Sequence, residues 1–303
     1  MPPDRTLSTE MSPVNREIRL DYGQRPSALA FMARALRPSP GLKRGVPAIS
    51  ARWRHRVAPA ELVRFNALSG LPESDTLPLL YPHTIAFPLH MAILTQPAFP
   101  VPIWRVLQVR NRIRQTAPLP RDATLEIMVR VAGHRILEKG AEFDLHTTVG
   151  EGATTAWESE NTFYVRGRFG APTADAVPEA PKVSLPETAT WRMPAGGGWH
   201  YGGLSGDYNG VHMFGWYARK LGFPRAFFHP QRVLGQCLAR LPQTAALPLG
   251  LEAWIKGPVF YGAPVALRHE SDADGTRFAL HVDGDARPAI VGRLRQAEEA
   301  GIR

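Results

Sequence analysis

Hydrophobic and polar positions alternate over the middle of the chain, and this period of two predicts β-strands. Four such runs follow one another, with β-branched residues inside them and glycine or proline between them. The predicted strands are Trp104–Ile113, Ala123–Val131, Glu142–Val149 and Thr155–Arg166. We interpret Gly133-His134 and Gly150-Glu151-Gly152 as turns. The first half of the chain is therefore expected to contain a sheet.

Other hydrophobic runs of the first half predict helices and one further strand. A short helix is expected over Pro26–Leu36, a strand over Ser50–Val57 and a helix over Ala58–Ser69. An apolar stretch with four prolines follows, and Leu89–Gln96 is its best helical segment. We take that segment as the first core helix. Residues 1–16 are polar and contain proline, which is typical of a loose tail.

The second half of the chain repeats this pattern of a helix followed by strands. A helix is predicted at about Arg232–Leu241, and four strand-like runs close the chain. These runs are Leu249–Ile255, Pro264–Glu270, Thr276–Val282 and Ala289–Leu294. A helix followed by four antiparallel strands, twice over, indicates an α+β fold built by duplication.

A proline-rich stretch with little hydrophobic pattern, Phe169–Pro186, separates the two halves and is typical of a linker. We therefore predict four segments. They are a tail with a short helix (1–45), a first repeat (46–170), a linker (171–188) and a second repeat (189–303).

Candidate chemistry is concentrated in the second repeat, in the stretch Trp199–Arg232. Ser205-Gly206-Asp207 is a turn or helix-start signal, and His212 follows five positions after Asp207. A turn at Asn209-Gly210 would fold the carboxylate and the imidazole back toward each other. Such a pair is suited to general acid/base chemistry on a bound water.

The first repeat contains only a faint echo of this stretch. Ser69-Gly70 corresponds to the serine and glycine of the motif, but Leu71-Pro72 follows where the second repeat has its aspartate. We therefore expect the first repeat to lack the acid/base pair.

The motif resembles the signature of the MaoC-like hydratases, Y-A-x-x-S-G-D-x-N-P-x-H. The matching positions at the right spacing are Tyr201, Ser205, Gly206, Asp207, Asn209 and His212. Three positions depart: Gly202 replaces an alanine, Gly210 replaces a proline, and Pro230 replaces the glycine of a later H-G pair. The resemblance implies a double hotdog, in which each repeat wraps an antiparallel sheet around a central helix.

The resemblance also implies an activity, the (R)-specific hydration of 2-enoyl thioesters or the reverse dehydration of 3-hydroxyacyl thioesters. The thioester would be carried by coenzyme A or an acyl carrier protein. Asp207 and His212 would be catalytic, and Ser205, Gly206 and Asn209 would support them. The helix start after His229 would present backbone N–H groups to the thioester oxygen. Pro230 has no N–H, so Gln231 is the expected substitute donor.

Two further functions remain open on these residues. The departures at Gly210 and Pro230 allow an acyl-thioester-binding protein without catalysis, and the same fold allows a thioesterase. For a hydratase or dehydratase we expect the first repeat to supply an apolar acyl tunnel, with Leu89–Gln96 as its helix.

Composition argues against nucleic-acid binding, disulfide bonds and a metal or nucleotide cofactor. The net charge of +9 comes mostly from arginine, which reflects either a general residue preference or attraction of an anionic ligand such as coenzyme A. No dense basic run with aromatic residues favours nucleic acid. Cys237, the only cysteine, excludes an internal disulfide. No metal or nucleotide motif appears, so we expect no metal and no cofactor.

The remaining expectations concern cellular location and assembly. No apolar run reaches the length of a membrane span, and the N-terminus has no secretory pattern, so we expect a cytoplasmic protein. Two fused hotdogs already imitate a dimer, so either a monomer or a homodimer is expected.

Overall fold

The computed structural model describes residues 17–152, 154–173, 178–242 and 247–296. Its strands form one sheet in the order β1-β2-β4-β5-β6-β3-β8-β11-β10-β9-β7. Their bounds are β1 Ile18–Tyr22, β2 Ile49–Arg56, β3 Val106–Gln115, β4 Thr124–Leu137, β5 Gly140–Glu151, β6 Thr154–Arg166, β7 Glu187–Arg192, β8 Leu249–Ile255, β9 Pro264–Asp272, β10 Gly275–Val282 and β11 Ile290–Gln296.

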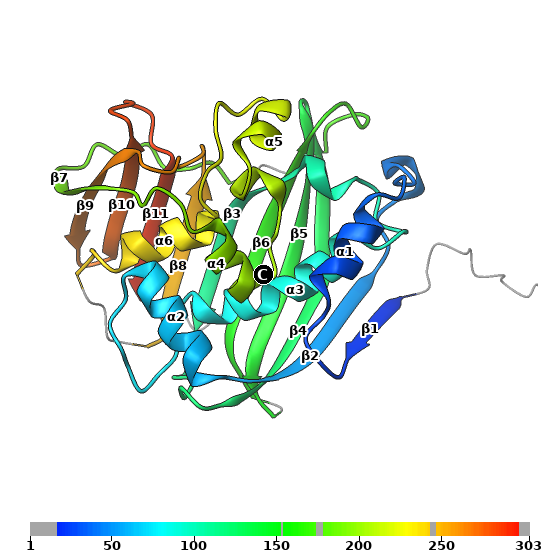
Figure 1. Cartoon of the computed structure of the whole chain (residues 1–303), viewed down its shortest axis with the longest axis horizontal. Helices are drawn as coiled ribbons and strands as arrows, with labels where there is room; N and C mark the ends of the chain where they lie inside the picture. Colours follow the sequence, from blue (N-terminus) through cyan, green and yellow to red (C-terminus); the bar gives the residue numbers. More distant parts are fainter. Residues whose placement is uncertain (1–16, 153, 174–177, 243–246, 297–303) are drawn as a thin grey trace, which may run out of the picture.

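The helices lie together on one face of this sheet (Figure 1). They are α1 Ala28–Ala35, α2 Pro59–Ser69, α3 Tyr81–Leu94, α4 Gly198–Ser205, α5 Gly215–Lys220 and α6 Pro230–Leu238, with short 3₁₀ turns η2 Leu42–Arg44, η3 Ile103–Arg105 and η4 Gly210–His212. None of the helices in these described ranges is long and apolar enough to cross a bilayer.

The strand order shows the duplication directly. Strands β2-β4-β5-β6-β3 form one half of the sheet, and β7-β9-β10-β11-β8 form the other half in the same sequence order. Helix α3 lies between β2 and β3 in the chain, and α6 lies between β7 and β8. The predicted α+β double hotdog is therefore confirmed. Strands β3 and β8 pair antiparallel from Arg110↔Trp254 to Gln115↔Leu249 and join the halves. The segment boundaries near residues 170 and 189 stay a prediction.

Each half also contains the same helix-ending turn. Helix α2 ends at Ser69 and α4 ends at Ser205, and the glycine after each, Gly70 and Gly206, has a positive φ of 72° and 76°. This left-handed conformation is one that glycine adopts without strain. The faint sequence echo is thus a shared turn, and only the second half continues from it into Asp207.

The first core helix is longer than predicted, because α3 spans Tyr81–Leu94 instead of Leu89–Gln96. Pro82 lies in its first turn, where proline is well tolerated, and Pro88 lies inside it. Twelve of its fourteen residues are buried. Burial in the core thus outweighs the helix-breaking tendency of Pro88.

Two other predictions need correction. Gly133-His134 is not a turn: it lies inside β4, at a β-bulge between Val131 and Gly133 where the register with β5 shifts. Strand β1 was missed, and it pairs in parallel with β2 from Ile18↔Ile49 to Tyr22↔Trp53. The predicted tail, residues 1–16, lies outside the described residues. Of the predicted turn Gly150-Glu151-Gly152, Gly150 and Glu151 are still paired with β6 as the end of β5, and only Gly152 lies in a turn.

Candidate functional site

The turn after α4 places Asp207 by a chain of short local hydrogen bonds. The Ser205 hydroxyl donates to the Tyr201 carbonyl at 3.0 Å and accepts the Asp207 N–H at 3.2 Å. Asp207 Oδ1 accepts the Asn209 N–H at 3.1 Å, and Asn209 Oδ1 accepts the Val211 N–H at 3.3 Å, which caps η4. The sequence thus folds back at Asn209, as the spacing predicted, and η4 carries His212 toward Asp207.

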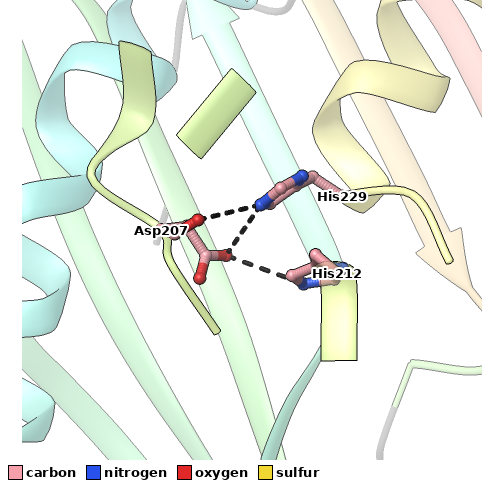
Figure 2. Close-up of side chains that lie close together, drawn as sticks. All are labelled: Asp207, His212 and His229. Carbon is pink, nitrogen blue, oxygen red and sulfur yellow. Dashed lines mark hydrogen bonds and ion pairs between the residues drawn. The ribbon is translucent and has the colours of Figure 1, made fainter. Parts of the chain in front are cut away.

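The side chains of Asp207, His212 and His229 meet at this turn (Figure 2). His212 Nε2 lies 3.8 Å from Asp207 Oδ2, and His229 Nε2 lies 3.9 Å from the same oxygen. The two imidazole rings stack with centroids 3.9 Å apart at 29°. His229 caps the start of α6 and also donates from Nε2 to the Asp207 carbonyl at 3.0 Å. The sequence predicted His229 as a substrate-binding or supporting residue at a helix start, and its direct contact with the pair was not expected.

Hydrogen bonds fix the proton positions on both imidazoles. His212 Nδ1 lies 3.0 Å from the Phe227 carbonyl, which only accepts, so Nδ1 carries the proton and Nε2 presents a lone pair toward Asp207. Burial lowers the pKa of His212, although the Asp207 charge and the Phe227 carbonyl act in the opposite direction. A neutral imidazole with its free nitrogen toward a carboxylate is suited to act as a base.

The neutral form is favoured more strongly for His229 than for His212. Burial, and after it the neighbouring His212, lowers the pKa of His229 well below its usual range. Two stacked imidazoles disfavour protonation of either ring, because the charges would lie close together in a dry environment. Of the two stacked rings, His229 is therefore the one whose neutral form is favoured by both burial and its neighbour.

The same three residues form the one group of metal-ligand type found among the described residues, with one atom of each within 4.8 Å of the others. A catalytic zinc site usually has three protein ligands. Here the His229 Nε2 proton is donated to the Asp207 carbonyl, so this nitrogen has no lone pair for a cation. Asp207 and His212 remain as two ligands, which is a poor fit to such a metal.

A cavity of about 460 Å³ opens beside the pair and is lined from both halves of the molecule. Asp207, Asn209 and His212 lie in its wall. The first half contributes mostly apolar side chains. They are Phe31 and Ala35 of α1, Phe87, Met91 and Leu94 of α3, and Phe163 of β6. A mostly apolar cavity therefore lies against the central helix of the first repeat, where the acyl tunnel is expected, and α1 adds a wall that was not predicted.

The predicted oxyanion donor is less well placed. Helix α6 contributes Pro230 and Val233 to the cavity wall. Gln231, whose N–H is the first that α6 offers, has a buried side chain, and neither atom of its amide has a partner among the described residues. Gln231 as donor to the thioester oxygen stays a prediction.

Residues of the first half form hydrogen bonds with α4, the helix that precedes Asp207. The Thr84 and Tyr201 hydroxyls lie 3.1 Å apart, and the Tyr201 ring packs on His229 with centroids 4.9 Å apart. Arg25 donates to the carbonyls of Gly203, at 3.1 Å, and of Leu204 at the end of α4. Sequence reasoning missed Thr84 and Arg25, which lie 117 and 178 positions from their partners.

The sequence of the chain is similar to that of one protein of known function. No family model matches the chain. A 3-hydroxyacyl-thioester dehydratase X of Mycobacterium tuberculosis is 27% identical over 186 residues, which cover 61% of this chain and 66% of that protein. The matched region thus spans slightly less than two thirds of the relative's length.

Solved structures share most of this architecture. The crystal structure of HtdX from Mycobacterium tuberculosis superposes with a TM-score of 0.70 at 22% identity, covering 82% of this chain and 100% of that one. A MaoC-like dehydratase from Phytophthora capsici gives a TM-score of 0.68 at 17% identity, covering 86% and 98%. The chain therefore has the double-hotdog fold of the MaoC-like dehydratases, which confirms the resemblance indicated by its motif.

Proposed function

We propose that this protein hydrates 2-enoyl thioesters, or dehydrates 3-hydroxyacyl thioesters, with Asp207 and His212 as its acid/base pair. One observation carries the proposal: Asp207 Oδ2 and the unprotonated His212 Nε2 face each other at 3.8 Å in the wall of an apolar cavity. Both atoms are hydrogen-bond acceptors, so they require a shared donor. A water that donates to both would direct its own lone pair toward a bound alkene.

The chemistry follows from this arrangement. In hydration, the water oxygen bonds to the β-carbon while one water proton passes to the pair. The alkene electrons move toward the thioester carbonyl, and the α-carbon then takes up a proton, so that H and OH are added and nothing else is consumed. Dehydration is the reverse, with removal of the α-proton and departure of the hydroxyl as water. Asp207 and His212 are suited to both proton transfers because they lie within reach of one water.

The developing charge on the thioester oxygen needs hydrogen-bond donors. Asn209 uses its Oδ1 to cap η4, and its Nδ2 group remains to donate on the cavity side of the turn. The Gln231 N–H is the second candidate. Pro230 has no N–H in the cavity wall.

The comparisons support the class of substrate. The Mycobacterium tuberculosis relative is named a 3-hydroxyacyl-thioester dehydratase, and the fold is shared with MaoC-like dehydratases. The thioester would be carried by coenzyme A or an acyl carrier protein, and the net charge of +9 suits the phosphates of either.

Pro230 favours a second candidate, a protein that binds acyl thioesters without turnover. Loss of one oxyanion donor typically costs on the order of 100- to 1,000-fold in rate. In this reading the cavity and the motif hold the thioester, and the pair has no chemical role.

The deciding experiment is hydration of crotonyl-CoA and a longer 2-enoyl-CoA, followed by loss of the enoyl absorbance. We expect turnover in the wild type that falls by roughly 100-fold or more in Asp207→Asn and His212→Ala. Asp274→Asn, an exposed aspartate between β9 and β10, is the matched control and should keep its rate. Release of free thiol would indicate a thioesterase. Binding without turnover would favour the second candidate.

A further inference from the structure

Polar side chains gather inside the first repeat, where the sheet faces α3. They are Asn111 of β3, Thr147 of β5, Ser159 and Asn161 of β6, and His83 and His90 of α3, here called the polar cluster. Each is at most 1% exposed. The strand register explains why they are neighbours, since Asn161 pairs with Asn111 and Ser159 pairs with Thr147.

The strands of the second repeat are apolar at this level of the sheet, while its helix α6 buries the polar side chains of Gln231, Arg232 and Gln236. Its strands β8 and β10, which correspond to β3 and β5, bury Leu251, Ala253, Phe278 and Leu280. The polar cluster is therefore a property of the first repeat and not of the shared fold.

Several atoms of the polar cluster have no partner among the described residues. His90 Nε2 hydrogen-bonds the Thr147 hydroxyl at 2.8 Å, and Asn161 Nδ2 donates to the Ser159 hydroxyl at 3.0 Å. Both ring nitrogens of His83, Nδ1 of His90 and both amide atoms of Asn111 are buried and unpartnered within the described ranges. Buried polar groups nearly always have a partner, so unpartnered atoms in such number point to a bound polar group or to water.

The cluster adjoins the acyl cavity through Gln108 and two aromatic rings. Gln108 lines the cavity, and its Nε2 donates to Asn161 Oδ1 at 2.5 Å. Phe87 and Phe163 also line the cavity, and their ring centroids lie 5.7 Å and 6.0 Å from that of His90. In the first repeat, a single layer of side chains thus separates the cavity from the polar cluster.

We infer that the acyl chain of the substrate carries a hydroxyl group, and that Gln108 hydrogen-bonds it. The carboxamide of Gln108 has Oε1 and a second Nε2–H left after its bond to Asn161. A hydroxyl both donates and accepts, so it satisfies either of these atoms. Asn161 orients the carboxamide and Ser159 orients Asn161. This inference rests on the proposed thioester substrate and deepens it.

Two physical expectations separate this inference from a plain hydrocarbon tunnel. In an apolar tunnel a hydroxyl loses its hydration without replacement, so a hydroxylated chain binds more weakly than the plain chain. Beside Gln108 the hydroxyl regains a partner, and the plain chain instead leaves Gln108 unsatisfied. Whether the hydroxylated or the plain chain binds more tightly therefore distinguishes a Gln108 site from a plain hydrocarbon tunnel.

The experiment is calorimetric binding of saturated acyl-CoAs of one chain length, plain or with one hydroxyl moved along the distal half of the chain. Saturated chains cannot be hydrated, so the result does not depend on catalysis. We expect one hydroxyl position to bind roughly three- to tenfold more tightly than the plain chain. The preference should disappear in Gln108→Met. It should persist in Gln96→Met, where the glutamine bonds only its own helix at Ala92.

Equal or weaker binding of every hydroxylated chain by the wild type would overturn the inference, whatever the variants do. A preference that survives in Gln108→Met would overturn the role of that residue. Failure of the proposed function has a different signature, which is absence of turnover on 2-enoyl-CoAs while the binding preference is still measurable. Thermal melting of Gln108→Met establishes that the variant is folded before its binding is compared.

Discussion

Acid should destabilise this protein, because burial lowers the pKa of several of its histidines in the folded state. Burial lowers the pKa of His83 to about 3, and burial lowers those of His90 and His229 well below the usual range. In the unfolded chain each returns to about 6.5. The folded pKa values are depressed, so their contribution to stability is complete above about pH 6.5 and is lost as the pH falls toward the folded values.

The size of the effect follows from the linkage relation. At about pH 5 His83 costs the folded state about 2 kcal/mol, because the unfolded chain binds a proton over roughly 1.5 pH units where the folded chain does not. That is an appreciable part of the 5–15 kcal/mol that is typical of a whole domain, and His90 and His229 act in the same direction. Glu160 acts in the opposite direction, since burial raises its pKa and the folded chain takes up that proton first.

The assay is urea unfolding, followed by circular dichroism, at about pH 7.5 and about pH 5. His83→Gln removes one buried titrating ring, so its stability should fall by about 2 kcal/mol less between the two pH values than that of the wild type. His200→Gln, an exposed position in α4, is the matched control and should behave as the wild type does. The reasoning is refuted if the wild type loses less than about 1 kcal/mol, or if both variants lose the same amount.

Three further predictions follow from the site and the core. The kcat/KM for hydration should fall on acidification with a midpoint below about pH 6.5, because burial lowers the pKa of His212 and only its neutral form is a base. A midpoint above this value would contradict the role of His212 as the base. Pro230→Gly should raise kcat by about tenfold or more by supplying an N–H at the cavity wall, and an unchanged kcat would show that another donor already serves. Gly292→Ala should lower the free energy of unfolding by roughly 1–3 kcal/mol, since a new Cβ would lie 2.2 Å from the Phe278 ring; Gly196→Ala, with open space around it, is the control, and equal melting temperatures would contradict the clash.

Local sequence signals predicted the second repeat and its motif well, because their information is short-range. The strand Leu249–Ile255 was predicted with both ends correct, since it alternates and ends at a glycine and a proline. The turn that brings Asp207 to His212 depends on side chains within a few residues of each other, such as Ser205 and Asn209. Such contacts are readable from spacing alone.

The errors came from features that only tertiary structure decides. Pro88 ends a helix in isolation, but α3 is surrounded by core and continues through it. Gly133 is a turn signal by composition, yet it forms a bulge because β5 pairs on both sides of it. His229 looked like a helix start, and its stacking on His212 depends on the packing of α6 against the motif. No local pattern encodes these contacts.

The duplication also explains why a repeat without the acid/base pair is retained. Helix α4 packs on α3 of the first half, and α2 packs on α6 of the second half, so each repeat completes the helical layer of the other. Thr84 holds Tyr201, and the Tyr201 ring in turn packs on His229. The first repeat also supplies the cavity wall at Phe87 and Phe163. The turn at Ser69-Gly70 in the first repeat has the same backbone conformation as Ser205-Gly206 but is not followed by an aspartate. The interior of the first repeat is therefore not constrained by an acid/base pair. The polar cluster lies in that interior, so under the proposed function the repeat without Asp207 and His212 would be the one that selects the acyl chain.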